Sequence, residues 1–380
     1  MAELLTPTVI RTYKYRLLPN KRQHADLRRI LEDQRQLYNA ALESRISYYA
    51  KTGKSMTYFG QCKELAELRK YADFGNTPSD LQRATLKRLD RSYRAFFRRL
   101  RKGGKVGFPR FKGRGWWDSF GFNEWSGIRF DGKRIRFKGL AGGLRVHLHR
   151  PLPEGKILSC QFGRDTKGWH ICFQLRIKAK LFLSAGKNIG LDMGLSSLAS
   201  TSTGHSIPNI RAAERHHFDM RRRQRHMSRC VKGSNGRSKA RERVARLHTK
   251  IRNTRRTYLH QVSAKLIREN DLIAIENLNI KGLAAGTLAK SIYDAGWATL
   301  NEFLAYKAES AGRQLIKVDP RNTTQACSGC GVIVPKDLNQ RWHECPDCGL
   351  SLDRDVNAAR NILARAVVRP QIDKLPTLVT

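Results

Sequence analysis

The chain has 380 residues and carries 73 Lys and Arg against 32 Asp and Glu, which gives a formal net charge of +41. Self-repulsion on this scale destabilises a compact fold unless a polyanion neutralises it, so the balance excludes a metabolic enzyme for small neutral substrates and favours nucleic acid as the partner. Since 40% of the residues are hydrophobic, the chain can still bury a sizeable core, and its length predicts two or three domains.

The apolar residues and the cysteines exclude two further classes of protein. No segment approaches the roughly 20 apolar residues of a membrane span. The basic residues are spread along the whole chain instead of along one amphipathic helix, so we expect no membrane partner. Four of the eight cysteines are scattered and the other four fall within 22 residues, a pattern typical of an intracellular metal site rather than of a disulfide framework.

The N-terminal part combines a β pattern with a helical stretch. Residues 9–17 alternate apolar and basic side chains and predict a strand. Apolar residues at helical spacing predict helices over 21–50, 57–71 and 79–102. From 116 to 180 short alternating strands follow, including a hairpin with Asp131 and Gly132 at its turn. We expect a small β-barrel or sheet that the first strand joins, with the helices inserted.

Two segments concentrate the positive charge. Residues 91–114 hold ten Arg or Lys and no acid, interleaved with four phenylalanines that either stack on unpaired bases or face a core. Residues 211–260, read as a polar helical arm, hold 17 Arg or Lys and three acids. From these segments we predict ten contacts to nucleic acid: Arg98, Arg99, Arg101, Lys102, Lys105, Arg110, Lys112, Arg221, Arg222 and Arg223.

Three acids stand at the edges of apolar elements in the second half of the chain. Asp192 follows a predicted strand, Glu276 closes the apolar strand 271–276, and Asp355 lies in the first turn of a helix that begins near Asp353. Three such carboxylates can converge on two Mg²⁺ ions that hold the attacking and leaving oxygens of a phosphodiester. Taken singly, Asp192 could close a turn, Glu276 could pair with an arginine, and Asp353 is most simply a helix N-cap.

The four clustered cysteines form two matched pairs. Cys327 and Cys330 are followed, after fourteen residues, by Cys345 and Cys348, and each pair ends in a glycine. Four thiolates in a tetrahedral array suit one Zn²⁺ with no open position, so the predicted site is structural. A redox dithiol is disfavoured because two adjacent knuckles explain more of the pattern.

In this order, the segments GLDMGLSSLAS, IAIENLNI, the two cysteine pairs and LDRDVNAARNI resemble the transposon-encoded TnpB (OrfB) family. The segments YKYRLLPNKRQ and GFPRFKG resemble it too, so the likeness extends from about residue 10 to 369. It implies an α/β and α+β multidomain protein: an RNase H-like (RuvC) nuclease domain with an inserted zinc ribbon, preceded by a β-barrel wedge domain with an inserted helical recognition bundle.

The resemblance also implies domain limits. The wedge domain would comprise residues 1–20 and 103–184, and the recognition helices would comprise residues 21–102. The nuclease domain takes 185–322 and 350–369, the zinc ribbon takes 323–349, and a flexible tail takes 370–380.

By the same resemblance, the three catalytic acids and Mg²⁺ ligands match Asp192, Glu276 and Asp355, the last because it stands two residues before Asn357. The implied activity is RNA-guided cleavage of double-stranded DNA beside a short target-adjacent motif, with a guide RNA from the transposon end. We expect a cytoplasmic, nucleoid-associated prokaryotic protein, and we favour a monomer. A DNA transposase and a catalytically silent guided repressor are the alternatives, and retention of all three acids disfavours the second.

Overall fold

The computed structural model describes residues 7–71, 74–104, 106–337 and 339–368. The predicted tail 370–380 and the predicted contact Lys105 lie outside this range. The chain divides into two compact units, with the division after Lys178. Among the described residues, no helix combines the length and the apolar character needed to cross a bilayer.

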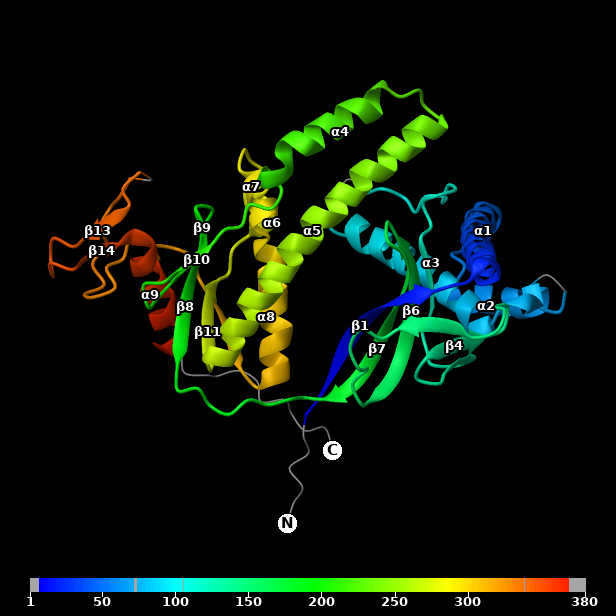
Figure 1. The fold of residues 1–380 in the computed structure, drawn as a ribbon, viewed down its shortest axis with the longest axis horizontal. Coiled ribbons are helices and arrows are strands. Elements are labelled where there is room, and N and C mark those ends of the chain that lie inside the picture. Colours follow the sequence, from blue (N-terminus) through cyan, green and yellow to red (C-terminus); the bar gives the residue numbers. More distant parts are fainter. Residues whose placement is uncertain (1–6, 72–73, 105, 338, 369–380) are drawn as a thin grey trace, which may run out of the picture. The chain divides into compact units, whose positions relative to one another are not determined.

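The first unit is built on a curled antiparallel sheet in the order β2-β6-β7-β1-β5-β4-β3 (Figure 1). As expected, the N-terminal strand joins this sheet, where it pairs with β7 on one side and β5 on the other. No ladder between β2 and β3 is present among the described strands, so closure into a barrel stays a prediction. The strands are β1 (Thr8–Leu18), β2 (Ser119–Phe122), β3 (Ile128–Phe130), β4 (Arg134–Phe137), β5 (Leu144–His147), β6 (Lys156–Asp165) and β7 (Gly168–Lys178).

Three helices lie between β1 and β2 in the chain: α1 (Lys21–Thr52), α2 (Tyr58–Leu68) and α3 (Ser79–Leu100). Asn20 and Gln23 start α1 with a capping box, and Gly53 ends it in the left-handed conformation. One apolar core joins helices and sheet, because Leu27 and Leu86 from the helices share it with Phe162 and Trp169 from the strands. The helical insertion and the sheet therefore form one packed unit.

The second unit holds a mixed sheet in the order β10-β9-β8-β11-β12. Strands β8, β11 and β12 run parallel, whereas β9 pairs antiparallel with β8 and β10 pairs antiparallel with β9. The strands are β8 (Asn188–Met193), β9 (Ser197–Thr201), β10 (Ser206–Pro208), β11 (Leu272–Glu276) and β12 (Gln314–Val318). A separate hairpin pairs β13 (Trp342–Glu344) with β14 (Ser351–Asp353).

Helices cover both faces of this sheet. Ile189, Leu191 and Ile275 point to a core shared with α5 (Asn235–Glu269) and α8 (Trp297–Ala311). The opposite face carries Ala274 and packs on α9 (Arg354–Val368). Since strand side chains alternate between faces, Gly190, Asp192 and Glu276 belong to the α9 face. Two short helices, α6 (Ile280–Leu283) and α7 (Ala289–Ala295), precede α8.

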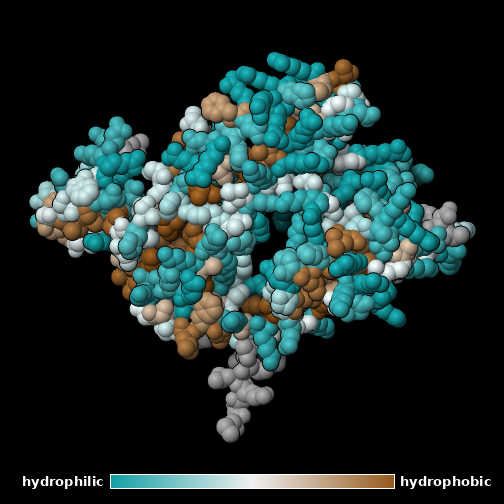
Figure 2. Space-filling model, in the orientation of Figure 1, coloured by the Kyte–Doolittle hydropathy of each residue, from teal (hydrophilic) through white to brown (hydrophobic). Residues whose placement is uncertain are grey.

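The predicted polar helical arm 211–260 contains helices α4 and α5. Helix α4 (His217–Arg229) ends before a turn in which Gly233 has a φ of 87°, and Ser234 then caps α5. Hydrophilic side chains dominate the surface over these two helices (Figure 2). The glycine and the capping serine in KGSNG were the available signal for this break.

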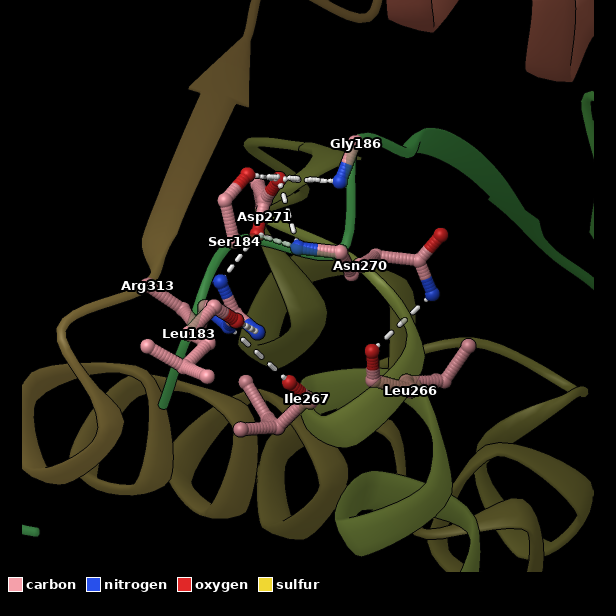
Figure 3. A network of polar contacts seen from close by, with 9 residues as sticks. Leu183, Ser184, Gly186, Leu266, Ile267, Asn270, Asp271 and Arg313 are labelled. Carbon is pink, nitrogen blue, oxygen red and sulfur yellow. Dashed lines mark hydrogen bonds and ion pairs between the residues drawn. The ribbon is translucent and has the colours of Figure 1, made fainter. Parts of the chain in front are cut away.

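Asp271, between α5 and β11, anchors the start of the second unit (Figure 3). Its carboxylate accepts the Ser184 hydroxyl at 2.6 Å and the backbone amides of Ala185 and Gly186 at 2.8 and 2.7 Å. Arg313 forms an ion pair with it, and these donors lower the pKa of Asp271 to about 2. Residues 184–186 are therefore held at the end of the mixed sheet where strand β11 begins.

Candidate active site

Asp192 and Glu276 are brought together by the register of two parallel strands. Ile275 lies opposite Leu191 in the β8–β11 ladder, so the next residues along, Glu276 and Asp192, are neighbours at the carboxyl ends of these strands. Both lie on the α9 face, and the Glu276 side chain is 8% exposed. The carboxyl edge of parallel strands is where open α/β sheets usually bind ligands.

Gly190 brings the third acid to the same place. A Cβ at Gly190 would overlap the carbonyl oxygen of Ala359, so the missing side chain lets α9 lie directly on β8. Asp355 is one helical turn before Ala359, and it lines the same cavity as Asp192. The sequence expectation that the three acids meet is consistent with this packing.

Asp353 has the capping role that the sequence predicted. Its Oδ1 accepts the backbone amides of Asp355 at 2.9 Å and Val356 at 3.1 Å. This is the geometry of a helix N-cap, and it occupies the carboxylate in starting α9.

Asp192 is electrostatically coupled to the other two acids. Burial, together with the charges of Glu276, Asp355 and Asp353, raises the pKa of Asp192 to about 8 against the opposing effect of Arg354. Burial also raises the pKa of Glu276, against the hydrogen bond from Thr323. A cluster of this kind favours either protons or cations at neutral pH.

An open cavity of about 670 Å³ gives access to the cluster. Asp192 and Asp355 line it, together with Arg341 and Arg354, whose guanidinium nitrogens lie 3.9 and 3.5 Å from the Asp355 carboxylate. Glu276 is not among the lining residues. A further acid of the wall, Asp294, is already bound by Arg255 at 2.6 Å and by the Ala213 amide at 2.8 Å, which marks it as structural.

The four cysteines form the second site. Cys327 Sγ lies 3.6 Å from Cys348 Sγ, Cys330 Sγ lies 3.5 Å from Cys345 Sγ, and all four sulfurs are within 4.8 Å of one another. Tetrahedral zinc with sulfur ligands requires sulfur separations of about 3.8 Å, so the set fits one Zn²⁺. Among the described residues this is the one group whose ligand atoms are gathered so closely; the three carboxylates are more widely spread.

The two cysteine knuckles have the same backbone. The amide of Gly331 donates to the Cys327 carbonyl at 2.9 Å, and the amide of Gly349 donates to the Cys345 carbonyl at 3.0 Å. Both glycines have positive φ, 84° and 70°. Burial raises the pKa of the Cys327 thiol, but the Cys330 amide and His343 outweigh it and lower that pKa to about 5.

Comparison with known proteins settles the family. Residues 183–286 match the OrfB model of IS605-type elements, described as "Probable transposase", and 8–54 match its "Helix-turn-helix domain". Residues 297–362 match "Cas12f1-like, TNB domain". A "Putative RNA-guided DNA endonuclease" of Streptomyces pristinaespiralis is 34% identical over 96% of this chain and 93% of its own length. The chain belongs to the OrfB (TnpB) family.

A second OrfB relative and one solved structure agree. InsQ of Escherichia coli K12, which has the same description, is 30% identical over 93% of this chain and 92% of its own. The "Cryo-EM structure of the Cas12f1-sgRNA-target DNA complex" matches with a TM-score of 0.53 at 12% identity, over 93% of this chain and 98% of that one. The chain therefore has a Cas12-like fold. The helix-turn-helix match covers strand β1 and the uninterrupted helix α1.

Sequence reasoning missed three polar residues of this OrfB protein. Asn357 and Asn361 lie four apart on the inner side of α9, and both are buried, as is Thr323. Asn361 Nδ2 donates to the Thr323 carbonyl at 2.9 Å, and Thr323 Oγ1 lies 2.6 Å from Glu276 Oε1. Two asparagines at helical spacing among alanines were the available signal, since an unpartnered amide is costly to bury.

The predicted nucleic-acid contacts lie in both units and differ in their surroundings. Arg98, Arg99, Arg101, Lys102, Arg110 and Arg221 are exposed. Lys112 is half-buried, with its Nζ 5.6 Å from the Tyr38 ring centre. Arg222 and Arg223 each form an ion pair with Asp219 at 3.0 Å, so these two guanidiniums are less available than expected.

The phenylalanines of 91–114 do not enter the core. Phe97, Phe108 and Phe111 are exposed, and Phe96 is half-buried. Phe96 contacts Phe97 and Phe108 with ring centres 5.1 and 5.3 Å apart. The structure thus replaces the core alternative with a surface cluster of aromatic rings beside the exposed arginines.

Proposed function

We propose that this OrfB-family protein is an RNA-guided DNA endonuclease of a transposable element. The observations that support the proposal are the strand register that makes Asp192 and Glu276 neighbours and the cavity that Asp192 and Asp355 line together. In this reading the second unit is an RNase H-like (RuvC) nuclease domain, the four-cysteine segment is its zinc ribbon, and the first unit is the wedge with its recognition helices. As a member of the family, the chain is an endonuclease.

Asp192, Glu276 and Asp355 would hold two Mg²⁺ ions, which supply an activated water and neutralise charge on the scissile phosphate. The donor set fits, because carboxylate oxygens are hard ligands and the mutual repulsion at Asp192 is relieved by cations. Arg341 and Arg354 reach the Asp355 carboxylate at the cavity wall and can contact a phosphate there. Thr323 donates to Glu276 and limits its rotation.

The partners follow from the charge and the relatives. A net charge of +41 suits a long guide RNA together with a double-stranded DNA target. The guide RNA would read the target by base pairing, and the protein would read a short adjacent motif. The proposed cut next to that motif uses one nuclease site for both strands in turn.

A transposase would use the same acids for strand transfer, so RNA dependence is the deciding test. We expect the expressed protein to copurify with one structured RNA species that has a variable end. Reprogramming that end should redirect Mg²⁺-dependent cleavage to a new DNA sequence. Cleavage or strand transfer that proceeds after ribonuclease treatment, with no dependence on the variable end, would contradict the proposal.

A further inference from the structure

We infer that Thr323, Asn357 and Asn361 are positioning residues that tie Glu276 to the four-cysteine ribbon, so that metal in the ribbon sets the cation affinity of the acid cluster. The inference rests on the proposed function for the role of the acids, but the contacts that carry it are independent of that role.

The first link fixes Glu276. Thr323 Oγ1 lies 2.6 Å from Glu276 Oε1 and 3.0 Å from the Pro320 carbonyl, and a hydroxyl has a single proton to donate. Donation to the carboxylate is the shorter and charge-assisted choice. Thr323 is 2% exposed, so water does not replace the hydroxyl easily. The orientation of Glu276 therefore depends on where Thr323 is held.

The second link fixes Thr323. The Asn361 amide donates from Nδ2 to the Thr323 carbonyl at 2.9 Å and to the Ala326 carbonyl at 2.6 Å. Both of its protons are used, and its side chain is 8% exposed. Loss of either acceptor would leave a buried donor without a hydrogen-bond partner, which is energetically unfavourable. One side chain of α9 thus holds the backbone on both sides of residues 324 and 325.

The third link reaches the cysteines. Asn357 Nδ2 donates to the Ala326 carbonyl at 2.7 Å, and its Oδ1 accepts the Ser328 amide at 2.9 Å. Ala326 and Ser328 flank Cys327, the first ligand of the ribbon, and the Asn357 side chain is fully buried. If the cysteines lose their metal, the first knuckle loses its shape, and the partners of Asn357 and Asn361 move with it. Thr323 and Glu276 then lose their fixed geometry.

A matched set of variants tests the first link in the full-length protein. Thr323→Val removes the hydroxyl and keeps the shape, whereas Thr323→Ser restores the hydroxyl. Thr201→Val is the control, because Thr201 is also a buried threonine with a hydrogen-bonded hydroxyl. Its Oγ1 lies 2.9 Å from the Thr203 hydroxyl and accepts the His205 amide at 2.9 Å. The readouts are Mn²⁺ binding without nucleic acid, followed by electron paramagnetic resonance, zinc content, and the Mg²⁺ dependence of guided cleavage.

Thr323→Val should weaken Mn²⁺ binding about tenfold or more, since a hydrogen bond to a charged group contributes about 1.5–3 kcal/mol. It should keep one zinc per chain and raise the Mg²⁺ requirement of cleavage by a similar factor. Thr323→Ser should recover the affinity, and Thr201→Val should keep it. Wild-type Mn²⁺ affinity in Thr323→Val would overturn the inference.

Zinc removal tests the coupling. Chelation of zinc from the wild-type protein should weaken Mn²⁺ binding, and in Thr323→Val it should add little, because both changes release the same carboxylate. Additive losses would overturn the inference. The Mn²⁺ measurements need no cleavage, so a protein that shows this coupling but never cuts DNA would refute the proposed function and leave the relay in place.

Discussion

Asp353 and Asp355 are separated by one residue, yet they do different work. Asp353 ends strand β14 and precedes the helix, whereas Asp355 lies in the first turn of α9. Asp353 bonds the first amides of α9, and Asp355 faces the cavity shared with Asp192. The sequence assigns Asp355 as the ligand because it stands two residues before Asn357, and the capping hydrogen bonds of Asp353 agree with that prediction.

Alanine at the proposed ligands should separate cleavage from binding. Asp192→Ala, Glu276→Ala and Asp355→Ala should each abolish Mg²⁺-dependent cleavage, because two cations cannot be held with one carboxylate missing. Guided DNA binding, measured by gel shift, should survive. Asp353→Ala should keep cleavage and lose about 1 kcal/mol of stability through the lost cap. Full cleavage by Asp355→Ala together with loss in Asp353→Ala would reverse the assignment.

The raised pKa of Asp192 predicts how stability depends on pH and cations. Between its ordinary value of 3.8 and about 8 the folded metal-free protein holds a proton that the unfolded chain has released, so stability falls as pH rises through this window. Asp192→Asn should therefore have a higher Tm than the wild type at pH 8 without Mg²⁺, by about 2–4 °C for each kcal/mol of repulsion relieved.

Mg²⁺ should reverse that order at pH 8. It should stabilise the wild-type protein by about 2.7 kcal/mol at a hundredfold excess over its Kd and have little effect on Asp192→Asn. Differential scanning calorimetry at pH 6 and pH 8, with and without Mg²⁺, measures both effects. A wild-type Tm that rises with pH in the absence of divalent cations would contradict the predicted sign.

At the scale of elements, the site depends on how closely α9 approaches β8. Gly190 permits that approach, and the two asparagines of α9 lock the helix to the segment that leads into the ribbon. The hairpin β13–β14 ends at Asp353, so the ribbon passes directly into the helix that carries Asp355. Helix, ribbon and sheet edge therefore set the geometry of the acids together.

Gly190→Ala should disturb both stability and cleavage. The added methyl group collides with the α9 backbone, and overpacking of this kind costs about 1–3 kcal/mol. Cleavage should fall more than stability alone explains, since Asp355 moves with the helix. Gly236→Ala is the control, because a Cβ there meets no atom closer than 3.7 Å and Ala is favoured in a helix. Urea unfolding measures the stability of both variants, and a cleavage assay measures their activity. Equal cleavage rates in the two variants would exclude this role for Gly190.

Loss of one ribbon cysteine should release the metal. Cys327→Ser or Cys348→Ser should reduce zinc from one atom per chain to none and loosen residues 327–348, because structural zinc contributes folding energy directly. Cys230→Ser, a thiol outside the cluster, should keep the zinc. Elemental analysis decides the matter, and four titratable ribbon thiols in the native wild-type protein without zinc would rule the site out.

At the scale of the whole molecule, the chain carries a formal net charge of +41. Arg98, Arg99 and Arg101 have no acidic partner among the residues that the structure describes, whereas Arg222 and Arg223 share Asp219. An arginine that is already ion-paired with a carboxylate neutralises an RNA phosphate less completely, so fewer counterions are released from the RNA. Arg98, Arg99 and Arg101 should therefore contribute more to RNA binding than Arg222 and Arg223.

RNA binding should weaken steeply with salt, and these two groups should differ. Each phosphate contact adds about 0.7–0.9 to the log–log slope, so replacing Arg98, Arg99 and Arg101 by Gln should lower the slope by about 2–3. Replacing Arg222 and Arg223 by Gln should lower it by less per residue. Filter binding of the guide RNA across a salt series measures the slopes. A nearly salt-independent affinity of the wild-type protein would remove the electrostatic basis of the proposal.

Local patterns in the sequence were sufficient for the main helices and strands, the four-cysteine cluster and the Asp353 cap. Alternation and helical spacing reflect which face of each element is buried, and knuckle spacing reflects the short reach of thiolates around one ion, so both can be read locally. The break between α4 and α5 was missed because a continuous basic pattern masked the Gly233 turn.

The tertiary structure alone decided what joins the distant segments. The neighbouring positions of Asp192 and Glu276 depend on strand register, and the position of Asp355 depends on a helix packing over Gly190. The hydrogen bonds of Thr323 and Asn361, and the ion pairs that occupy Arg222 and Arg223, depend on neighbours that no local pattern specifies. Burial and long-range pairing are properties of the folded chain, and they determine both the raised pKa of Asp192 and the link between the ribbon and the acids.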